Sequence, residues 1–165
     1  MGAMERVHTY RARMEWTGNR GPGTERYDAY DRAFAVRSQG KPTLFGSSDP
    51  GFRGDSSRWN PEELLVASLS SCHMLWYLHL CAVNQIRVVE YEDRAEGRMR
   101  EDPTGGGRFE EVRLRPRAVI AGGDAARARA LHDDAHRKCF IAASVNFPVV
   151  HEPEVIVRGT VSDSR

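Results

Sequence analysis

Residues 60–83 read NPEELLVASLSSCHMLWYLHLCAV, and this stretch predicts one long helix. Asn60 can cap its N-terminus, Pro61 suits the first helical position, and Glu63 suits the acid of a capping box. Apolar side chains cover nearly the whole circumference from Leu64 onward, and such a helix is usually buried on nearly all sides. A sheet of the same chain can cover one side, so we expect a second copy of the chain to cover the other.

The rest of the chain predicts strands around this helix. Alternating, β-forming stretches predict strands at residues 7–16, 27–36, 86–99, 109–121 and 154–161. Residues 101–107 predict a hairpin turn, and residues 123–140 predict a second helix capped by Asp124. Residues 38–59 predict a long loop rich in Gly, Ser, Pro and Asp. The order β-β-α-β-β-α-β predicts a single α+β domain over residues 1–165 with antiparallel sheet.

The composition excludes several functional classes. The formal net charge is +1, so no overall field attracts nucleic acid or a membrane surface. The sequence contains no run of about 18 uninterrupted apolar residues, so we do not expect a membrane-spanning helix. The N-terminal residues lack a signal-peptide core. The three cysteines are too few and odd in number for a secreted disulfide framework. We therefore expect a protein of the reducing cytoplasm.

Cys72 lies in the middle of the predicted helix and is either a small core residue or a nucleophile. Cys81 follows nine residues later, on the opposite side of the helix, so it cannot bridge to Cys72 within this helix. We interpret Cys81 as a core residue. Cys139 closes the second helix and could pair with Cys72 if the helices are adjacent, but the spacing alone does not decide this.

A reactive Cys72 needs a positive neighbour, because burial in an apolar helix would by itself raise the pKa of its thiol. Arg20 in the turn GNRGPG is a candidate, and Glu62 could hold its guanidinium by a bidentate pair. Alternatively, Glu62 only complements the helix dipole. Glu62 precedes Cys72 by ten residues, about 15 Å along a helix. A shared site therefore needs either long side chains that span this distance or a Glu62 from another chain, as in a two-fold dimer with antiparallel long helices.

At these residues the chain resembles the OsmC/Ohr family of thiol-dependent hydroperoxide reductases. The stretch NPEELLVASLSSC (60–72) resembles the family's reactive-cysteine helix, and AHRKCFIAASVNFPV (135–149) is similar to the segment with the second cysteine. The resemblance implies an α+β OsmC-like fold with a long buried central helix and an intertwined homodimer. It also implies that Cys72 is the peroxidatic cysteine and Cys139 the resolving cysteine.

The resemblance further implies that Arg20 and Glu62 activate the thiolate. The chain would reduce organic hydroperoxides, with hydrogen peroxide as a second candidate, through a Cys72 sulfenic acid and a Cys72–Cys139 disulfide. An external dithiol, of the lipoyl type or a small thiol, would reduce the disulfide, and the chemistry requires no metal or organic cofactor. The arginine turn and the residues after Cys139 differ from the Ohr branch, which places the chain nearer OsmC and makes Arg53 and Arg58 alternative guanidinium donors.

Two alternative functions stay open. His132, His136 and Cys139 have the spacing H-x3-H-x2-C, which could form a zinc site on one helix face, although solvated histidines explain the same pattern. The fold could also bind an apolar ligand or partner without turnover. His73, next to Cys72, is a candidate supporting group, and it does not share a helix face with His79.

Overall fold

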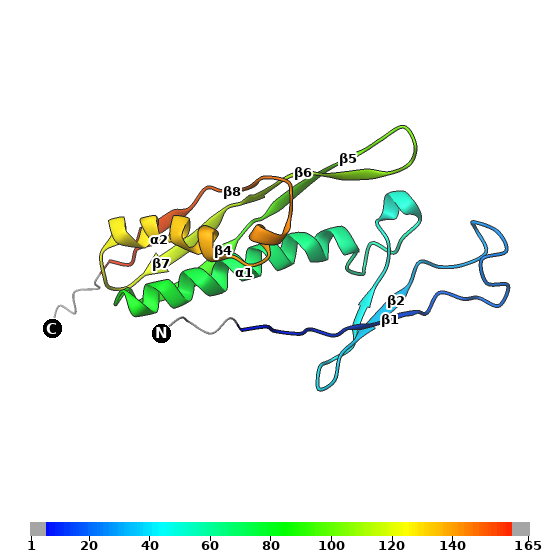
Figure 1. Cartoon of the computed structure of the whole chain (residues 1–165), viewed down its shortest axis with the longest axis horizontal. Helices are drawn as coiled ribbons and strands as arrows, with labels where there is room; N and C mark the ends of the chain where they lie inside the picture. Colours follow the sequence, from blue (N-terminus) through cyan, green and yellow to red (C-terminus); the bar gives the residue numbers. More distant parts are fainter. Residues whose placement is uncertain (1–5, 160–165) are drawn as a thin grey trace. The chain divides into compact units, whose positions relative to one another are not determined.

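The computed structural model of the chain describes residues 6–159, and its contacts divide them into two units that meet in sequence after Glu62 (Figure 1). The first unit holds a small sheet, and the second holds the remaining strands and most of the helical residues. The predicted α+β class is confirmed. The single domain over residues 1–165 stays a prediction.

Three short strands form the sheet of the first unit: β1 (Arg13–Trp16), β2 (Phe34–Arg37) and β3 (Leu44–Gly46). The strands are antiparallel in the order β1-β2-β3. The strands predicted at 7–16 and 27–36 are therefore present but much shorter than predicted. The predicted loop at 38–59 was wrong in part, because it contains β3 and a 3-10 helix at Pro50–Phe52.

Helix α1 spans Pro61–Val83 and begins and ends where the sequence predicted. Its buried side chains recur every three or four residues and therefore share one side of the helix: Leu69, His73, Tyr77, Leu80 and Cys81. Leu75 and Val83 are each 62% exposed. The chain thus covers one side of α1 and leaves an apolar side open.

Helix α1 is also long and apolar enough to cross a membrane by length and composition, with 22% of its most apolar window buried. This is weak evidence on its own, because the core helix of a soluble protein has the same length and composition. The absence of a membrane partner stays a prediction.

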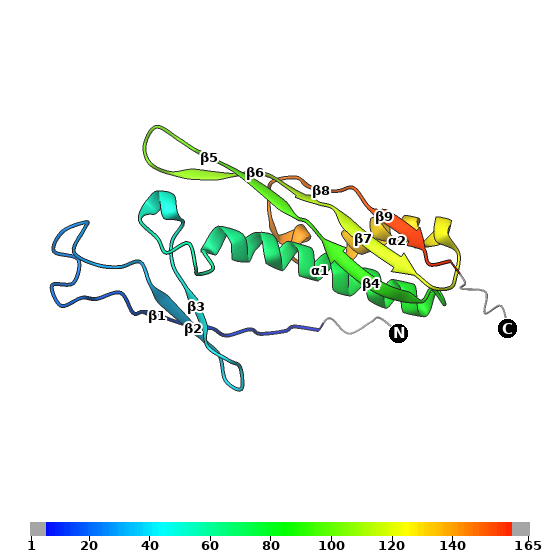
Figure 2. The same ribbon diagram turned by 180° about the vertical axis from the view of Figure 1, so that it is seen from behind.

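The strands of the second unit are β4 (Val88–Asp93), β5 (Glu96–Glu101), β6 (Gly107–Leu114), β7 (Pro116–Ile120), β8 (Val149–His151) and β9 (Glu154–Val157). They form two sheets, β4-β7-β9 and β5-β6-β8 (Figure 2). The pairs β4–β7 and β5–β6 are antiparallel as predicted, and β5–β6 is the predicted hairpin. The pairs β7–β9 and β6–β8 are parallel, so the sheets are mixed.

Two predicted strands are each divided in two, because the chain passes from one sheet to the other in both of them. The strand predicted at 86–99 gives β4 and β5, and the one predicted at 109–121 gives β6 and β7. Asp93 lies at this point, and its carboxylate accepts hydrogen bonds from the Arg115 backbone N–H at 2.7 Å and from the Ser70 hydroxyl of α1 at 2.5 Å. A tertiary contact therefore fixes the break.

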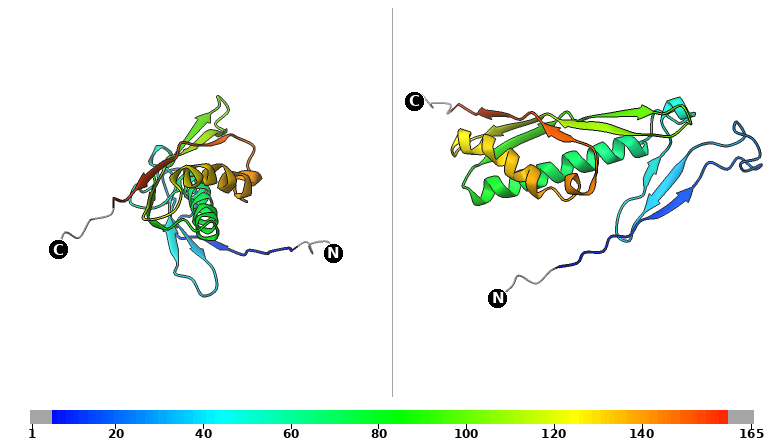
Figure 3. Two further views of the ribbon diagram at one scale, coloured as in Figure 1. Left: turned by 90° about the vertical axis from the view of Figure 1, so that its left-hand side faces the viewer. Right: turned by 45° about the horizontal axis from the view of Figure 1, so that its top comes forward.

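Helix α2 spans Ala125–Lys138, and the Asp124 side chain caps it as predicted by accepting from the N–H groups of Ala126 and Arg127. Figure 3 shows α1 and α2 on the same side of the strands. Their shared core consists of Tyr77, Leu80, Cys81, Ile86, Ala118, Ile120, Ala128, Leu131 and Ala135. This packing positions the C-terminal end of α2 against the middle of α1.

Candidate thiol site

Cys72 and Cys139 meet at the contact between the two helices. Cys72 is half-buried in α1, whereas Cys139 is only 1% exposed and is the residue at which α2 ends. Both are free thiols, and the Cys72 side chain lies close enough to Cys139 to raise the pKa of its thiol. The structure therefore brings together the two cysteines whose pairing the sequence left open.

The electrostatics of the pair are asymmetric. Burial, together with the neighbouring Cys72 side chain, raises the pKa of Cys139 to about 11. The Ala142 backbone N–H, 3.4 Å from the Cys139 sulfur, acts in the opposite direction. Cys139 is therefore a neutral thiol near neutral pH.

Cys81 is the matched contrast on the same helix. It is 1% exposed and lies in the core shared by α1 and α2, as predicted. Burial raises the pKa of its thiol. A buried neutral thiol of this kind behaves as a small hydrophobic side chain.

An aromatic surface flanks the thiol pair. Trp76 lies one turn after Cys72, and its ring meets that of Phe140 edge-on with 5.6 Å between centroids. Phe140 is 70% exposed although it directly follows Cys139. The Lys138 ammonium lies 5.6 Å from the centre of the Trp76 ring. Lys138 is a cation of this unit that the sequence reasoning, which considered only arginines, did not identify.

Arg20 belongs to the first unit. The Asn19 side chain accepts hydrogen bonds from the N–H groups of Gly21 and Gly23, both of which have positive φ, and this shapes the turn that carries Arg20. The Arg20 guanidinium donates to the Asp28 carbonyl and lies 3.7 Å from the Asp31 carboxylate. Its role toward Cys72 stays a prediction.

The alternative arginines also belong to the first unit. Arg53 ends the 3-10 helix with a φ of 64° and lies 5.7 Å from the centre of the Tyr27 ring. Arg58 forms an ion pair with Asp55 at 3.3 Å. Neither contact assigns or removes a role at the thiol pair, so both stay alternative donors.

Glu62 has an unusual carboxylate in the described structure. One of its oxygens is out of contact with solvent and has no hydrogen-bond partner among residues 6–159. Buried carboxylate oxygens normally have partners, so a partner from outside the described chain fits this site. This agrees with the expected pairing to a guanidinium without identifying which one.

Four imidazole rings lie together where α1, α2 and β8 meet. The sequence did not indicate that they form a group. We call them the imidazole cluster: His73 of α1, His132 and His136 of α2, and His151 of β8. His73 Nε2 lies 3.0 Å from His132 Nδ1, and the His151 ring lies 5.5 Å from that of His73 and 5.1 Å from that of His136. The one signal in the sequence was the i, i+4 spacing of His132 and His136.

This arrangement does not support the zinc alternative at His132, His136 and Cys139. His132 is fully buried and stacks on Tyr77 with 3.7 Å between ring centroids. Within residues 6–159, no group of three or more His, Cys, Asp or Glu side chains is arranged to hold a metal ion. Instead, the His132 ring packs against Tyr77 and the His136 ring against His151.

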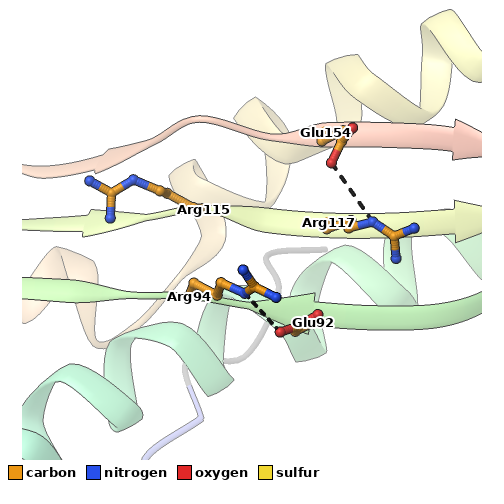
Figure 4. A pocket seen from close by; sticks show the side chains of 5 residues that line it. All are labelled: Glu92, Arg94, Arg115, Arg117 and Glu154. Carbon is orange, nitrogen blue, oxygen red and sulfur yellow. Dashed lines mark hydrogen bonds and ion pairs between the residues drawn. The ribbon is translucent and has the colours of Figure 1, made fainter.

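A charged cavity of about 330 Å³ lies elsewhere on the second unit (Figure 4). Its lining residues are Glu92, Arg94, Arg115, Arg117 and Glu154. Arg94 pairs with Glu92 at 3.0 Å and Arg117 with Glu154 at 3.8 Å. None of the predicted site residues lines it, and its charges largely satisfy one another.

Comparisons with known proteins connect this geometry to a family. The family model described as OsmC-like protein matches residues 54–154. An OsmC-like protein of unknown function from Vibrio cholerae has a similar structure, with 30% identity, a TM-score of 0.78, and coverage of 89% of this chain and 99% of that chain. No curated protein matches the chain.

Two more distant structures share the fold. An organic hydroperoxide resistance protein from Elizabethkingia anophelis is 21% identical with a TM-score of 0.66, and the match covers 94% of this chain and 100% of that chain. One from Legionella pneumophila is 20% identical with a TM-score of 0.65, and the match covers 93% of this chain and 100% of that chain.

Proposed function

Because the chain belongs to the OsmC-like protein family, we propose that it is a thiol-dependent peroxidase that reduces organic hydroperoxides. The observation that carries this proposal is the pair of neighbouring free thiols, one half-buried and one buried. The names of the Elizabethkingia and Legionella structures, both organic hydroperoxide resistance proteins, agree with the substrate class. We propose hydrogen peroxide as a second substrate.

In the first step the Cys72 thiolate attacks the terminal oxygen of the hydroperoxide. The O–O bond breaks, the alkoxide leaves and takes up a proton, and Cys72 becomes a sulfenic acid. Cys72 suits this role because it is the more exposed of the two cysteines, whereas the raised pKa of Cys139 keeps that thiol protonated.

In the second step Cys139 resolves the sulfenic acid. Its sulfur loses its proton and attacks the Cys72 sulfur, the S–O bond breaks, and water leaves as the disulfide forms. The pKa of about 11 keeps Cys139 protonated until this moment, so it does not compete for peroxide. Its position at the end of α2 already places it beside Cys72.

An external dithiol completes the cycle by thiol–disulfide exchange and leaves as a disulfide itself. We propose a lipoyl-type dithiol or a small thiol as this reductant and the cytoplasm as the setting. The steps need no metal or organic cofactor, and neither nucleic acid nor a membrane takes part. The net charge of +1 agrees with the absence of a nucleic-acid partner.

Activation of Cys72 is assigned to Arg20 held by Glu62, with Arg53 and Arg58 as alternatives. Glu62 lies on the same helix as Cys72 and ten residues before it, so it acts on the Cys72 of a second chain. The buried oxygen of Glu62 without a partner and the open apolar side of α1 around Leu75 favour such an intertwined homodimer.

The apolar surface beside the thiols favours an organic substrate. Trp76 and Phe140 offer ring faces and edges next to Cys72, and Phe140 is largely exposed. An alkyl or aryl group of the hydroperoxide would bury part of this surface, and hydrogen peroxide would not.

The proposal is tested by counting free thiols in the denatured protein after one equivalent of cumene hydroperoxide per chain. We expect the count to fall from three to one, because Cys72 and Cys139 become a disulfide and Cys81 stays reduced. The Cys81→Ala variant is the matched control and should fall from two to none. If Cys72→Ser consumes peroxide at the parent rate, the assignment is wrong. An intact dimer that consumes no peroxide supports the non-catalytic alternative.

A further inference from the structure

The imidazole cluster spans the same helix contact as the thiols. His73 directly follows Cys72 in α1, and His132 and His136 precede Cys139 by seven and three residues in α2. The 3.0 Å contact between His73 Nε2 and His132 Nδ1 is therefore a polar link between the helices that carry the two sulfurs. One of these nitrogens must donate and the other accept.

His73 and His132 form the buried, neutral centre of the cluster. His73 is 1% exposed and His132 is 0% exposed. Burial, with a smaller contribution from neighbouring imidazoles, lowers the pKa of His73 to about 4 and that of His132 to about 3. Burial also lowers the pKa of His136. Three ring nitrogens of the cluster are buried without hydrogen-bond partners in the described structure: His73 Nδ1, His132 Nε2 and His136 Nδ1.

The charged groups around the cluster do little to offset the free-energy cost of protonating one of its buried rings. On α2, Asp133 lies 2.9 Å from His151 Nε2 and favours a charge on His132 and His136. Arg129 and Arg137, also on α2, disfavour a charge on His132 and His136 respectively. The α1 side contributes Tyr77, which stacks on His132 and carries no charge near neutral pH. Burial and the neighbouring imidazoles outweigh Asp133, so protonation of His73 and His132 is disfavoured.

We propose that the imidazole cluster is an acid-sensitive clamp that positions Cys139 against Cys72 and releases α2 from α1 when the rings take up protons. Its consequence for disulfide formation rests on the proposed function, whereas the clamp itself does not. In the docked state, in which α2 packs against α1, His73 and His132 stay neutral. In the undocked state, in which α2 has left α1, both rings are exposed to water, where a histidine has a pKa near 6.5. His73 and His132 are positioning residues, because they act through the sulfurs that they hold together.

The expected pH dependence follows from linkage. Below about pH 6.5 the undocked state binds more protons than the docked state, so acid favours undocking. Each buried histidine shifts the ratio of docked to undocked protein by up to about tenfold per pH unit. The pair therefore shifts it by up to about 100-fold per pH unit until the pH reaches the pKa of docked His73, about 4. Above pH 7 the clamp has no pH dependence.

The clamp is tested first in the unmodified protein, so that no variant has to fold. Ring NMR signals of the histidines are followed from pH 8 to 4, and hydrogen exchange of the α2 amides is followed over the same range after correction for the intrinsic rate. We expect at least two rings to titrate well below pH 6.5 and the protection of α2 to fall steeply below pH 6. Ring signals that all titrate near pH 6.5 would overturn the proposal.

Variants then connect the clamp to the thiols. Diamide, which oxidises dithiols without peroxide, is used to form the Cys72–Cys139 disulfide at pH 7.5 and 5.5, and each variant is compared with the parent at the same pH. His132→Gln and the less buried His136→Gln should lower the disulfide yield at pH 7.5 and flatten the acid dependence of α2 protection. His79→Gln, exposed on α1 outside the cluster, is the matched control and should behave as the parent. If both cluster variants keep the parent's pH profile, the clamp is wrong, and peroxide turnover, measured separately, is unaffected by that result.

Discussion

The two sides of α1 differ although one helix supplies both. The side that carries His73, Tyr77 and Cys81 is buried against α2 and the sheet β4-β7-β9. The side that carries Leu75 and Val83 is equally apolar in sequence but lies open in the chain.

Cys72 lies at the border between the two sides. At about 100° per residue it is about 100° from His73 and about 180° from Cys81. In this comparison the two cysteines share an apolar helix and differ in their position on it, and the proposed nucleophile is the one that is not enclosed. Cys81 is enclosed on all sides, whereas Cys72 has a thiol partner on one flank and open surface on the other.

The largest expected effect separates the two cysteines of α1. Cys72→Ser should lower peroxide consumption by about 1000-fold, because a serine hydroxyl is a far weaker nucleophile than a thiolate. Cys81→Ala should keep the parent rate to within about twofold and lose only packing energy. Steady-state assays with cumene hydroperoxide and a dithiol measure both. Comparable losses in the two variants would remove the distinction between the two cysteines.

A second contrast concerns stability on the two sides. Leu69 is fully buried, so Leu69→Ala should lower the free energy of unfolding by about 2–5 kcal/mol through lost burial and a cavity. Leu75 is 62% exposed within the chain, so Leu75→Ala should change the folding of an isolated chain by less than about 0.5 kcal/mol. Urea unfolding at several protein concentrations checks this, since a concentration-dependent loss in Leu75→Ala indicates that a second chain covers this side.

The buried side should also make the fold acid-sensitive. The pKa values of His73 and His132 are lowered in the folded state, so the unfolded state binds more protons below about pH 6.5. The free energy of unfolding should be constant above pH 7 and fall by up to about 1.4 kcal/mol per pH unit for each histidine between about pH 6.5 and 4. Urea titrations at pH 7.5, 6.0 and 5.0 measure the slope. A stability that does not change across this range would show that these rings are protonated without cost.

The smallest of the four effects concerns the partner of Cys72. Cys139→Ser should still reduce one equivalent of peroxide, because Cys72 performs the first step, but turnover with a dithiol should fall by about tenfold as the sulfenic acid waits for an external thiol or is oxidised further. Rapid-mixing and steady-state assays separate the two steps. If the first step is lost as well, then Cys139, and not Cys72, is the residue that reacts with peroxide.

The sequence predicted α1 well because its start signals lie in adjacent residues and its apolar run is continuous. It could not predict the division of the strands, because the alternating pattern at 86–99 continues through the point where Asp93 binds the Arg115 backbone. Strand β8, with three residues and a parallel partner, left no local signal. These features depend on contacts between distant segments rather than on local preference.

The candidate site was predicted only in part for a similar reason. Resemblance to a family assigned Cys72 and Cys139, and the fold brings them together. The imidazole cluster draws its rings from two helices and a strand, so no spacing in the sequence joins His73 to His151. The only visible part, His132 and His136, matched a zinc pattern instead. Lys138 was overlooked because its relation to the site depends on the Trp76 ring on the other helix.

The central claim is that peroxide converts Cys72 and Cys139 into a disulfide, and mass spectrometry of the peroxide-treated protein tests it most directly. After digestion without reduction, we expect a cross-linked peptide pair containing Cys72 and Cys139, a loss of two hydrogens in the intact mass, and an unmodified Cys81. A disulfide that includes Cys81, or a Cys72 that remains a free thiol after excess cumene hydroperoxide, would contradict the account.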